Sequence, residues 1–178
     1  MKTTITEALA ELATLDKRLP KKAADMLPYV ARLEQIKDPF VKTGGSEKYL
    51  AEQRQSFSDL QVRKIMLRSA IAKANAETVI EVAGRSMSVA DWLVWKRECY
   101  QPYVQMLKGL LGQAQGARAE AQKRGVALVT TNTASTPEDI VVNVDEQGLV
   151  NEIDGMEEVY GRLDGLLSLK NATTMIEV

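Results

Sequence analysis

The residues best suited to chemistry in this sequence are carboxylates, two tryptophans and one thiol, because the chain contains no histidine. Histidine is the commonest general base and metal ligand, and it is the usual partner of a nucleophilic Ser or Cys. Cys99 lies on the apolar stripe of a predicted helix without such a partner, so we expect a buried packing thiol. With one cysteine no intramolecular disulfide can form, which favours a reducing compartment. The sequence therefore predicts a protein that is not an enzyme.

Acidic residues occur in adjacent pairs, a pattern that could serve acid–base chemistry or bind a divalent cation. The members of each pair are neighbours in sequence rather than one helical turn apart, so solvated surface charge near turns and helix starts is the favoured interpretation. The glycine-rich run of the chain lies inside a helical pattern and does not follow a strand, which excludes a phosphate-binding loop. We therefore predict no catalytic residue, no metal site and no cofactor. The pairs are Glu138-Asp139, Asp145-Glu146 and Glu157-Glu158.

The densest group of recognition-type residues is an aromatic and basic cluster around the two tryptophans. Core packing is the favoured interpretation of this cluster, and two alternatives stay open. The first is a protein interface, and the second is a pocket for a small nucleotide-like ligand. The cluster comprises Trp92, Trp95, Lys96, Arg97, Tyr100 and Tyr103.

The spacing of apolar residues along the chain predicts a mainly α protein with a small β element, in a single elongated domain spanning residues 1–178. The N-terminal region, residues 1–37, is predicted to be helical. A capping box at Thr4 with Glu7 opens the first helix, and we expect Pro20 to end or bend it. A second short helix is expected within residues 21–37. The apolar seam of the first helix is Ile5, Ala8, Leu12, Leu15 and Leu19.

Residues 46–124 are predicted to form a long helix, a β-hairpin and a second long helix, which pack as antiparallel helices. Ser46 is a suitable N-cap for the first of these helices. Alternating apolar and polar residues around a turn at Ala83-Gly84 predict the hairpin. Ser88 opens the second helix, which Pro102 should kink in the preceding turn.

Small residues at spacings of three and four on one side of the second long helix let another helix approach closely. They are Gly109, Gly112 and Gly116.

Residues 140–178 are predicted to form a strand, a helix and a strand, after a polar loop at 130–137. The last helix, from about Leu149 to Leu169, has the cleanest apolar seam of the chain. That seam comprises Leu149, Ile153, Met156, Tyr160, Leu163 and Leu167.

An internal repeat links two parts of the chain, because residues 75–82 match residues 171–178 at six of eight positions. Each copy follows a long helix, so we expect two helix-plus-strand units that sit side by side and pair their short strands. Strand edges of this kind also invite pairing with a second chain. The strand-edge residues are Thr78, Ile80, Val82, Thr174, Ile176 and Val178.

Composition narrows the location and the partners. The formal charge of −1 gives no general electrostatic reason for binding nucleic acid, which makes that partner unlikely. The first residues lack the apolar core of a signal peptide, and no stretch has the ~20 apolar residues that span a bilayer, so we expect no membrane insertion. We expect a protein of the cytosol, or one assembled there.

In several segments the sequence resembles the septicolysin-like family, a group of small helical proteins that occur in bacteria and in tailed phages. The similarity lies in the run from Leu67 to Asn75, in Thr78, Gly84 and the run from Ser88 to Leu93, and in the two ends of the chain. The resemblance implies a helical hairpin with a small β element and a tendency to oligomerise. It implies no catalytic residues.

Two functional hypotheses follow. The leading one is a non-enzymatic oligomeric structural or interaction protein of a phage, made in the host cytosol and acting as a capsid or tail accessory component, with other virion proteins as further partners. Its motivation is an excess of amphipathic seams over what one small core can bury. The alternative is an oligomeric protein that sequesters a small nucleotide-like ligand, as an anti-defence sponge would.

Overall fold

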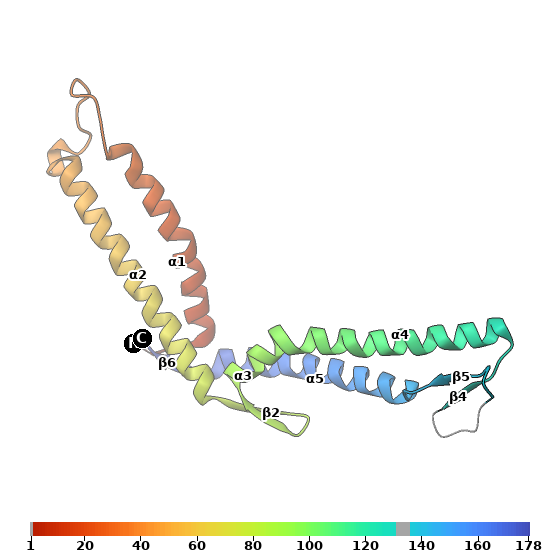
Figure 1. Ribbon diagram of the computed structural model, residues 1–178. Coiled ribbons are helices and arrows are strands. Elements are labelled where there is room, and N and C mark those ends of the chain that lie inside the picture. Colours follow the sequence, from red (N-terminus) through yellow and green to blue (C-terminus); the bar gives the residue numbers. More distant parts are fainter. Residues whose placement is uncertain (1, 131–135) are drawn as a thin grey trace. The chain divides into compact units, whose positions relative to one another are not determined.

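The computed structural model describes residues 2–130 and 136–178, and it is mainly α-helical with short strands (Figure 1). The fold class predicted from the sequence is therefore confirmed. The chain divides into two compact units: unit 1 is residues 1–78 and 168–178, and unit 2 is residues 79–167. The single domain expected for residues 1–178 stays a prediction. Most of the predicted polar loop, residues 131–135, lies outside the described residues.

Unit 1 is an antiparallel pair of helices with a two-stranded ribbon at one end (Figure 1). Helix α1 (Ile5–Met26) and helix α2 (Gly45–Glu77) are joined by a connection that contains two 3₁₀ turns, η1 (Leu27–Tyr29) and η2 (Val41–Thr43). Strand β1 (Lys2–Thr4) pairs antiparallel with strand β6 (Met175–Glu177), so the first and last strands of the chain lie together.

The start of α1 is fixed by the predicted capping box. The Thr4 hydroxyl accepts a hydrogen bond from the Glu7 backbone N–H at 3.2 Å, and the Glu7 carboxylate accepts one from the Thr4 backbone N–H at 2.8 Å. These bonds satisfy backbone donors that the first helical turn leaves without partners. The capping box is therefore confirmed, and it sets the direction in which α1 leaves strand β1.

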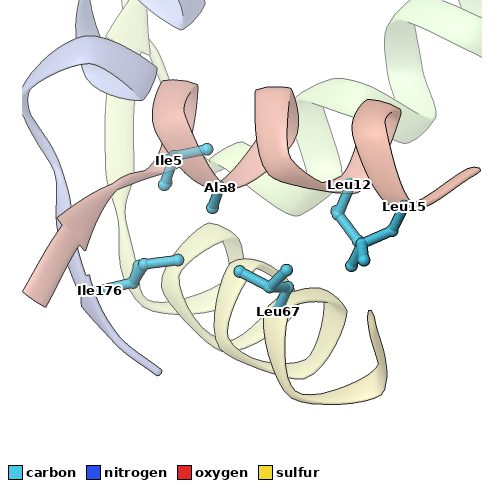
Figure 2. Packing of buried hydrophobic residues seen from close by; sticks show 6 residues of the cluster. All are labelled: Ile5, Ala8, Leu12, Leu15, Leu67 and Ile176. Atoms are coloured by element: carbon cyan, nitrogen blue, oxygen red, sulfur yellow. The ribbon is translucent and has the colours of Figure 1, made fainter. Parts of the chain in front are cut away.

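The core of unit 1 is the seam between α1, α2 and β6 (Figure 2). All five residues of the predicted α1 seam are buried. Four of them, Ile5, Ala8, Leu12 and Leu15, meet Leu67 of α2, which has no exposed surface, and Ile176 of β6. In Figure 2 these side chains point toward one another from the three elements. Leu67 is the most deeply buried residue of α2, and half-buried side chains of the same helix pack beside it: Leu60, Ala70, Ile71 and Ala74.

Two basic residues of α2, Arg63 and Lys64, form ion pairs with acidic residues of α1. The Arg63 guanidinium donates two hydrogen bonds to the Glu11 carboxylate at 2.8 and 3.0 Å. The Lys64 ammonium lies 2.5 Å from the Asp16 carboxylate. These partly exposed pairs fix the register of the two helices more than they stabilise the fold, because ion pairs near solvent contribute little.

Two sequence predictions for unit 1 were wrong, and a third was wrong in part. Pro20 does not end α1, which continues to Met26, because Pro20 lies on the exposed face, where water can solvate the carbonyl that it leaves without a donor. The alternative, that Pro20 bends the helix, stays a prediction. The second short helix expected within residues 21–37 is replaced by the end of α1 and by η1. The N-cap of α2 is Gly44 rather than Ser46, because the Asp38 carboxylate binds the Ser46 N–H at 2.8 Å from outside the helix.

Unit 2 begins with the predicted hairpin, strands β2 (Val79–Val82) and β3 (Arg85–Ser88). The turn residues Ala83 and Gly84 have φ angles of +50° and +75°, the pattern of a type I′ turn. Ser88 then caps helix α3 (Val89–Val94) by accepting a hydrogen bond from the Asp91 N–H. Both the hairpin and the cap were predicted, because each depends on a few adjacent residues.

The rest of unit 2 is a second antiparallel helix pair with a short parallel strand pair (Figure 1). A π-helical turn, η3 (Trp95–Cys99), joins α3 to helix α4 (Tyr100–Arg124). Strands β4 (Leu128–Thr130) and β5 (Ile140–Val142) precede helix α5 (Glu146–Thr173), whose last residues belong to unit 1. This π-helical turn lies just ahead of Pro102, where the sequence predicted a kink, and the kink itself stays a prediction.

The core of unit 2 follows the seam of α5. Five of the six residues predicted for this seam are buried, and Tyr160 is half-buried. They pack against Trp92 and the hairpin at one end, against Tyr100 and Val104 in the middle, and against Leu107 at the other end.

The repeat is real in local structure but was wrong in its pairing. In both copies a threonine N–H, of Thr78 and of Thr174, closes the last turn of the helix before a short strand begins. The two strands do not pair with each other, since β2 pairs with β3 and β6 pairs with β1. A two-residue turn closes the first pair locally, and the strand before α1, which the sequence did not predict, supplies the second.

Unit 1 should depend strongly on Leu67. Replacing Leu67 with Ala should lower the free energy of unfolding by about 2–5 kcal/mol, because the change leaves a cavity between two helices. The matched control is Leu169→Ala in the same unit, whose side chain is 57% exposed and should change stability by less than about 0.5 kcal/mol. Urea unfolding followed by circular dichroism measures both, and equal effects would contradict the packing described here.

Unit 1 should also lose stability in acid. Hydrogen bonds from Thr4, Arg63 and Lys64 hold the pKa values of Glu7, Glu11 and Asp16 below their ordinary values. Stability from carboxylates with lowered pKa values is present above the ordinary pKa, about 4, and is lost as pH falls through the lowered values. The urea midpoint should therefore drop below pH 4, and it should drop less in the double variant E11Q/D16N. An equal drop in both proteins would assign the acid sensitivity to other groups.

Candidate functional site: a groove beside Trp95

The aromatic cluster predicted from the sequence lies in unit 2, and part of it is core. Trp92 has no exposed surface, and its indole N–H donates a hydrogen bond to the Ile80 carbonyl at 3.1 Å. Tyr100 is buried and stacks on Tyr160 with ring centroids 4.4 Å apart. Burial raises the pKa of the Tyr100 hydroxyl, which keeps that group neutral. Core packing is thus the structural role of these two residues.

Trp95 is half-buried and forms the boundary between this core and the surface. Its ring meets Trp92 edge to face with centroids 5.4 Å apart, and it lies 5.5 Å from Tyr100. Edge-to-face contacts of this kind hold an aromatic ring in one orientation. The π-helical turn that begins at Trp95 sets the direction of the residues that follow it.

A groove of about 480 Å³ opens beside Trp95. Its walls come from η3, α4 and α5, and its charged groups are Arg85 at the hairpin and Glu152 on α5. Grooves of this size, with an aromatic wall and few polar groups, are typical of small-molecule or side-chain binding sites. The lining includes Arg85, Trp95, Cys99, Tyr103, Glu152 and Val159.

Two of the polar groups at the groove bind each other, and Lys96 close by is also paired. The Tyr103 hydroxyl donates a hydrogen bond to the Glu152 carboxylate, which raises the pKa of that hydroxyl. Lys96 pairs with the Asp164 carboxylate, and that bond raises the pKa of the Lys96 ammonium. The Lys96 ammonium also lies 4.9 Å from the centre of the Tyr160 ring. Lys96 is therefore held away from the groove as a structural cation.

Arg97, the other basic residue of the predicted cluster, does not line the groove. Its guanidinium donates to the Leu93 carbonyl of the preceding turn at 3.2 Å. The cation of the groove is Arg85, which the sequence did not single out. Arg85 and Glu152 were missed because a hairpin residue and a residue of α5 come together only through tertiary packing. The hairpin signal placed Arg85 on a strand but gave no indication of its neighbours.

The prediction that Cys99 is buried was wrong, because Cys99 is exposed and lines the groove. The π-helical turn contains one more residue per turn than an α-helix, so the face of the helix that points inward changes there. After the turn the buried residues are Tyr100, Val104 and Leu107. The row of Cys99 and Tyr103 turns outward as a result.

The three acidic pairs make structural contacts. Asp139 accepts hydrogen bonds from the Thr136 and Ala127 backbones, and the Thr136 bond lowers the pKa of that carboxyl. Within residues 2–130 and 136–178, no group of three or more metal-ligating side chains comes together. In the other pairs, Asp145 binds the Gln147 N–H, and Glu146, Glu157 and Glu158 form ion pairs with Arg118, Lys108 and Arg162.

The predicted glycine row on α4 lies open. A Cβ atom built on Gly109, Gly112 or Gly116 would meet no atom within 4 Å, so no other described element of this chain packs there. The close approach of another helix over these residues stays a prediction.

Comparisons with protein families, with curated proteins and with solved structures found no match to this chain. The resemblance to the septicolysin-like family therefore stays a prediction. None of the described helices has both the length and the apolar character needed to cross a bilayer.

The exposure of Cys99 can be measured directly. In the folded protein its thiol should react with Ellman's reagent at a rate close to that of the chain unfolded in guanidinium, because no element covers it. The unfolded sample also provides the thiol count. Reaction only after unfolding would show that Cys99 is covered, either by a different course of η3 or by a second chain.

Proposed function

We propose that this protein is a non-enzymatic structural or interaction protein that works as a homo-oligomer. The observation that best supports this proposal is a row of exposed apolar residues on α4. Tyr103, Met106 and Leu110 are 40%, 47% and 41% exposed, and their spacing places them on one face of the helix. Contiguous apolar surface of this kind is uncommon on monomers and is typical of protein interfaces.

Helix α2 presents a second apolar face to solvent. Val62, Ile65 and Met66 are 53%, 67% and 47% exposed, whereas Leu67 on the other side has no exposed surface. A lone helix pair buries only one stripe of each helix, so apolar residues on a second stripe require another partner. Both units therefore expose an apolar helix face in addition to the one that they bury.

The most specific form of the proposal is an accessory component of a phage virion, in the capsid or tail, made in the host cytosol. The resemblance noted in the sequence and the paired helices support this form. Virion proteins commonly bury such faces against copies of themselves or against other virion proteins. Detection of the chain in purified phage particles by mass spectrometry tests this form.

The alternative is sequestration of a small nucleotide-like ligand, and the groove beside Trp95 favours it. Trp95 and Tyr103 offer aromatic faces for stacking a base, and Arg85 offers a cation for an anionic group. Glu152 opposes this interpretation, because its carboxylate lies in the same groove and repels anions.

Native mass spectrometry of gently purified protein separates the two functions. We expect a discrete oligomer whose mass is a whole-number multiple of the 19.7 kDa chain. A stoichiometric surplus of the mass of a small molecule, lost in the variant W95A, would support sequestration instead. A monomer at micromolar concentration would contradict both.

A further inference from the structure

Charge is distributed unequally between the two units. Unit 1 has 15 basic and 11 acidic residues, a net charge of +4, whereas unit 2 has 8 basic and 13 acidic residues, a net charge of −5. All of the surplus positive charge lies in residues 17–48, with 8 basic and 4 acidic residues. Residues 125–161 of unit 2 contain 8 acidic residues and no Lys or Arg. The near-zero total therefore conceals one basic and one acidic surface.

The basic surface is the hairpin tip, which we define as residues 17–48: the end of α1, the connection and the start of α2. It is also strongly apolar. Five of its large apolar side chains are exposed by 53–70%. A patch that combines apolar side chains with positive charge suits a partner that is apolar at its centre and acidic at its rim. The exposed residues are Leu27, Val30, Leu33, Ile36 and Val41.

The hairpin tip is held in shape by its own contacts. The rings of Phe40 and Tyr49 stack with centroids 4.0 Å apart, and Tyr29 meets Phe40 edge to face at 4.8 Å. The Asp38 carboxylate accepts hydrogen bonds at 2.8 Å from the backbone N–H groups of Phe40 and Ser46. A preorganised loop loses less conformational entropy on binding, so its exposed apolar residues can contribute to affinity.

The acidic surface contains a hollow of about 850 Å³, which we call the acidic hollow. Helices α4 and α5 and the strands β4 and β5 line it. The charged residues in the lining are Asp145, Glu146 and Arg118, and Arg118 is paired with Glu146. Asp154, one turn beyond the lining residue Val150 on α5, adds an exposed carboxylate. The apolar lining residues are Leu111, Leu128, Val129, Val142, Val144 and Val150.

We propose that the hairpin tip of one copy docks in the acidic hollow of a second copy. This inference rests on the proposed oligomeric function and names the two surfaces that meet. The tip has exposed apolar side chains with basic residues around them. The hollow has an apolar lining with acidic residues around it. The two surfaces therefore complement each other in apolar character and in charge. The contact joins two different surfaces of the same protein, so it is heterologous. Repetition of such a contact builds a ring or an extended assembly.

Two variants test the proposal, one for each surface. K37E/K42E reverses two exposed charges of the tip for which no ion pair is seen in the described chain. V150K/D154K places two positive charges at the hollow, on one face of α5. The control K73E/R97E has the same charge change as the tip variant but lies on α2 and η3, away from both surfaces. Circular dichroism first confirms that all variants are folded.

Sedimentation velocity then measures the mass of each variant alone and of equimolar mixtures. We expect the wild type and the control to assemble, and to dissociate as the salt concentration rises, because the contact joins opposite charges. Each variant alone should be monomeric, since one of its two surfaces is damaged. A mixture of the two should associate again, because an intact hollow on one protein meets an intact tip on the other, and the altered tip and altered hollow also carry opposite charges.

Other results would overturn the docking and would separate it from the oligomeric function. If both variants assemble like the wild type, the protein is an oligomer that uses other surfaces, so the docking is wrong and the proposed function stands. The docking is also wrong if the two variants are monomeric and do not combine. A wild type that stays monomeric contradicts both proposals. If that monomer also floats with phosphatidylserine vesicles through its tip, the occupant of the tip is a lipid surface.

Discussion

Two antiparallel helices bury only the side chains along the line where they meet, and this constraint governs both units of the protein. In unit 1 the line consists of the α1 seam, Leu67 and Ile176. In unit 2 it follows the α5 seam past Trp92, Tyr100 and Leu107. Many apolar side chains away from these lines are exposed in the single chain. The exposed faces of α2 and α4 and the hairpin tip are consequences of the architecture, and the proposed assembly follows from them.

Polar contacts give each unit its register, while their contribution to stability is small. Glu11 and Asp16 meet Arg63 and Lys64 across the first pair of helices, and Lys96 meets Asp164 across the second. The net charge is positive at the hairpin tip and negative along residues 125–161, although three carboxylates of that run are paired with cations outside it: Glu146 with Arg118, Glu157 with Lys108 and Glu158 with Arg162. A contact between two such surfaces would be specific, because two hairpin tips, or two acidic hollows, carry charge of the same sign and repel each other.

The sequence predicted features that depend on adjacent residues and missed those that depend on distant ones. The Thr4 capping box, the Ala83-Gly84 turn and the α5 seam follow from local patterns, and the structure contains all three. The pairing of β1 with β6 joins the two ends of the chain, so no local pattern could reveal it. Cys99 was placed on the wrong face because one extra residue in a π-helical turn redirects everything after it. The groove was predicted only in part, since Trp95 and Tyr103 were identified but Arg85 and Glu152 were not.

Hydroxyl-radical footprinting of the full chain over a range of protein concentrations tests the central claim, that copies of the chain cover the apolar surface that a single chain exposes. The account predicts that Leu33 and Met106, which are 63% and 47% exposed in the single chain, are oxidised slowly at high concentration and faster on dilution. Buried Leu12 should stay protected throughout and serves as the internal control. Rapid oxidation of Leu33 and Met106 at every concentration would show that these faces stay in water, and would contradict the account.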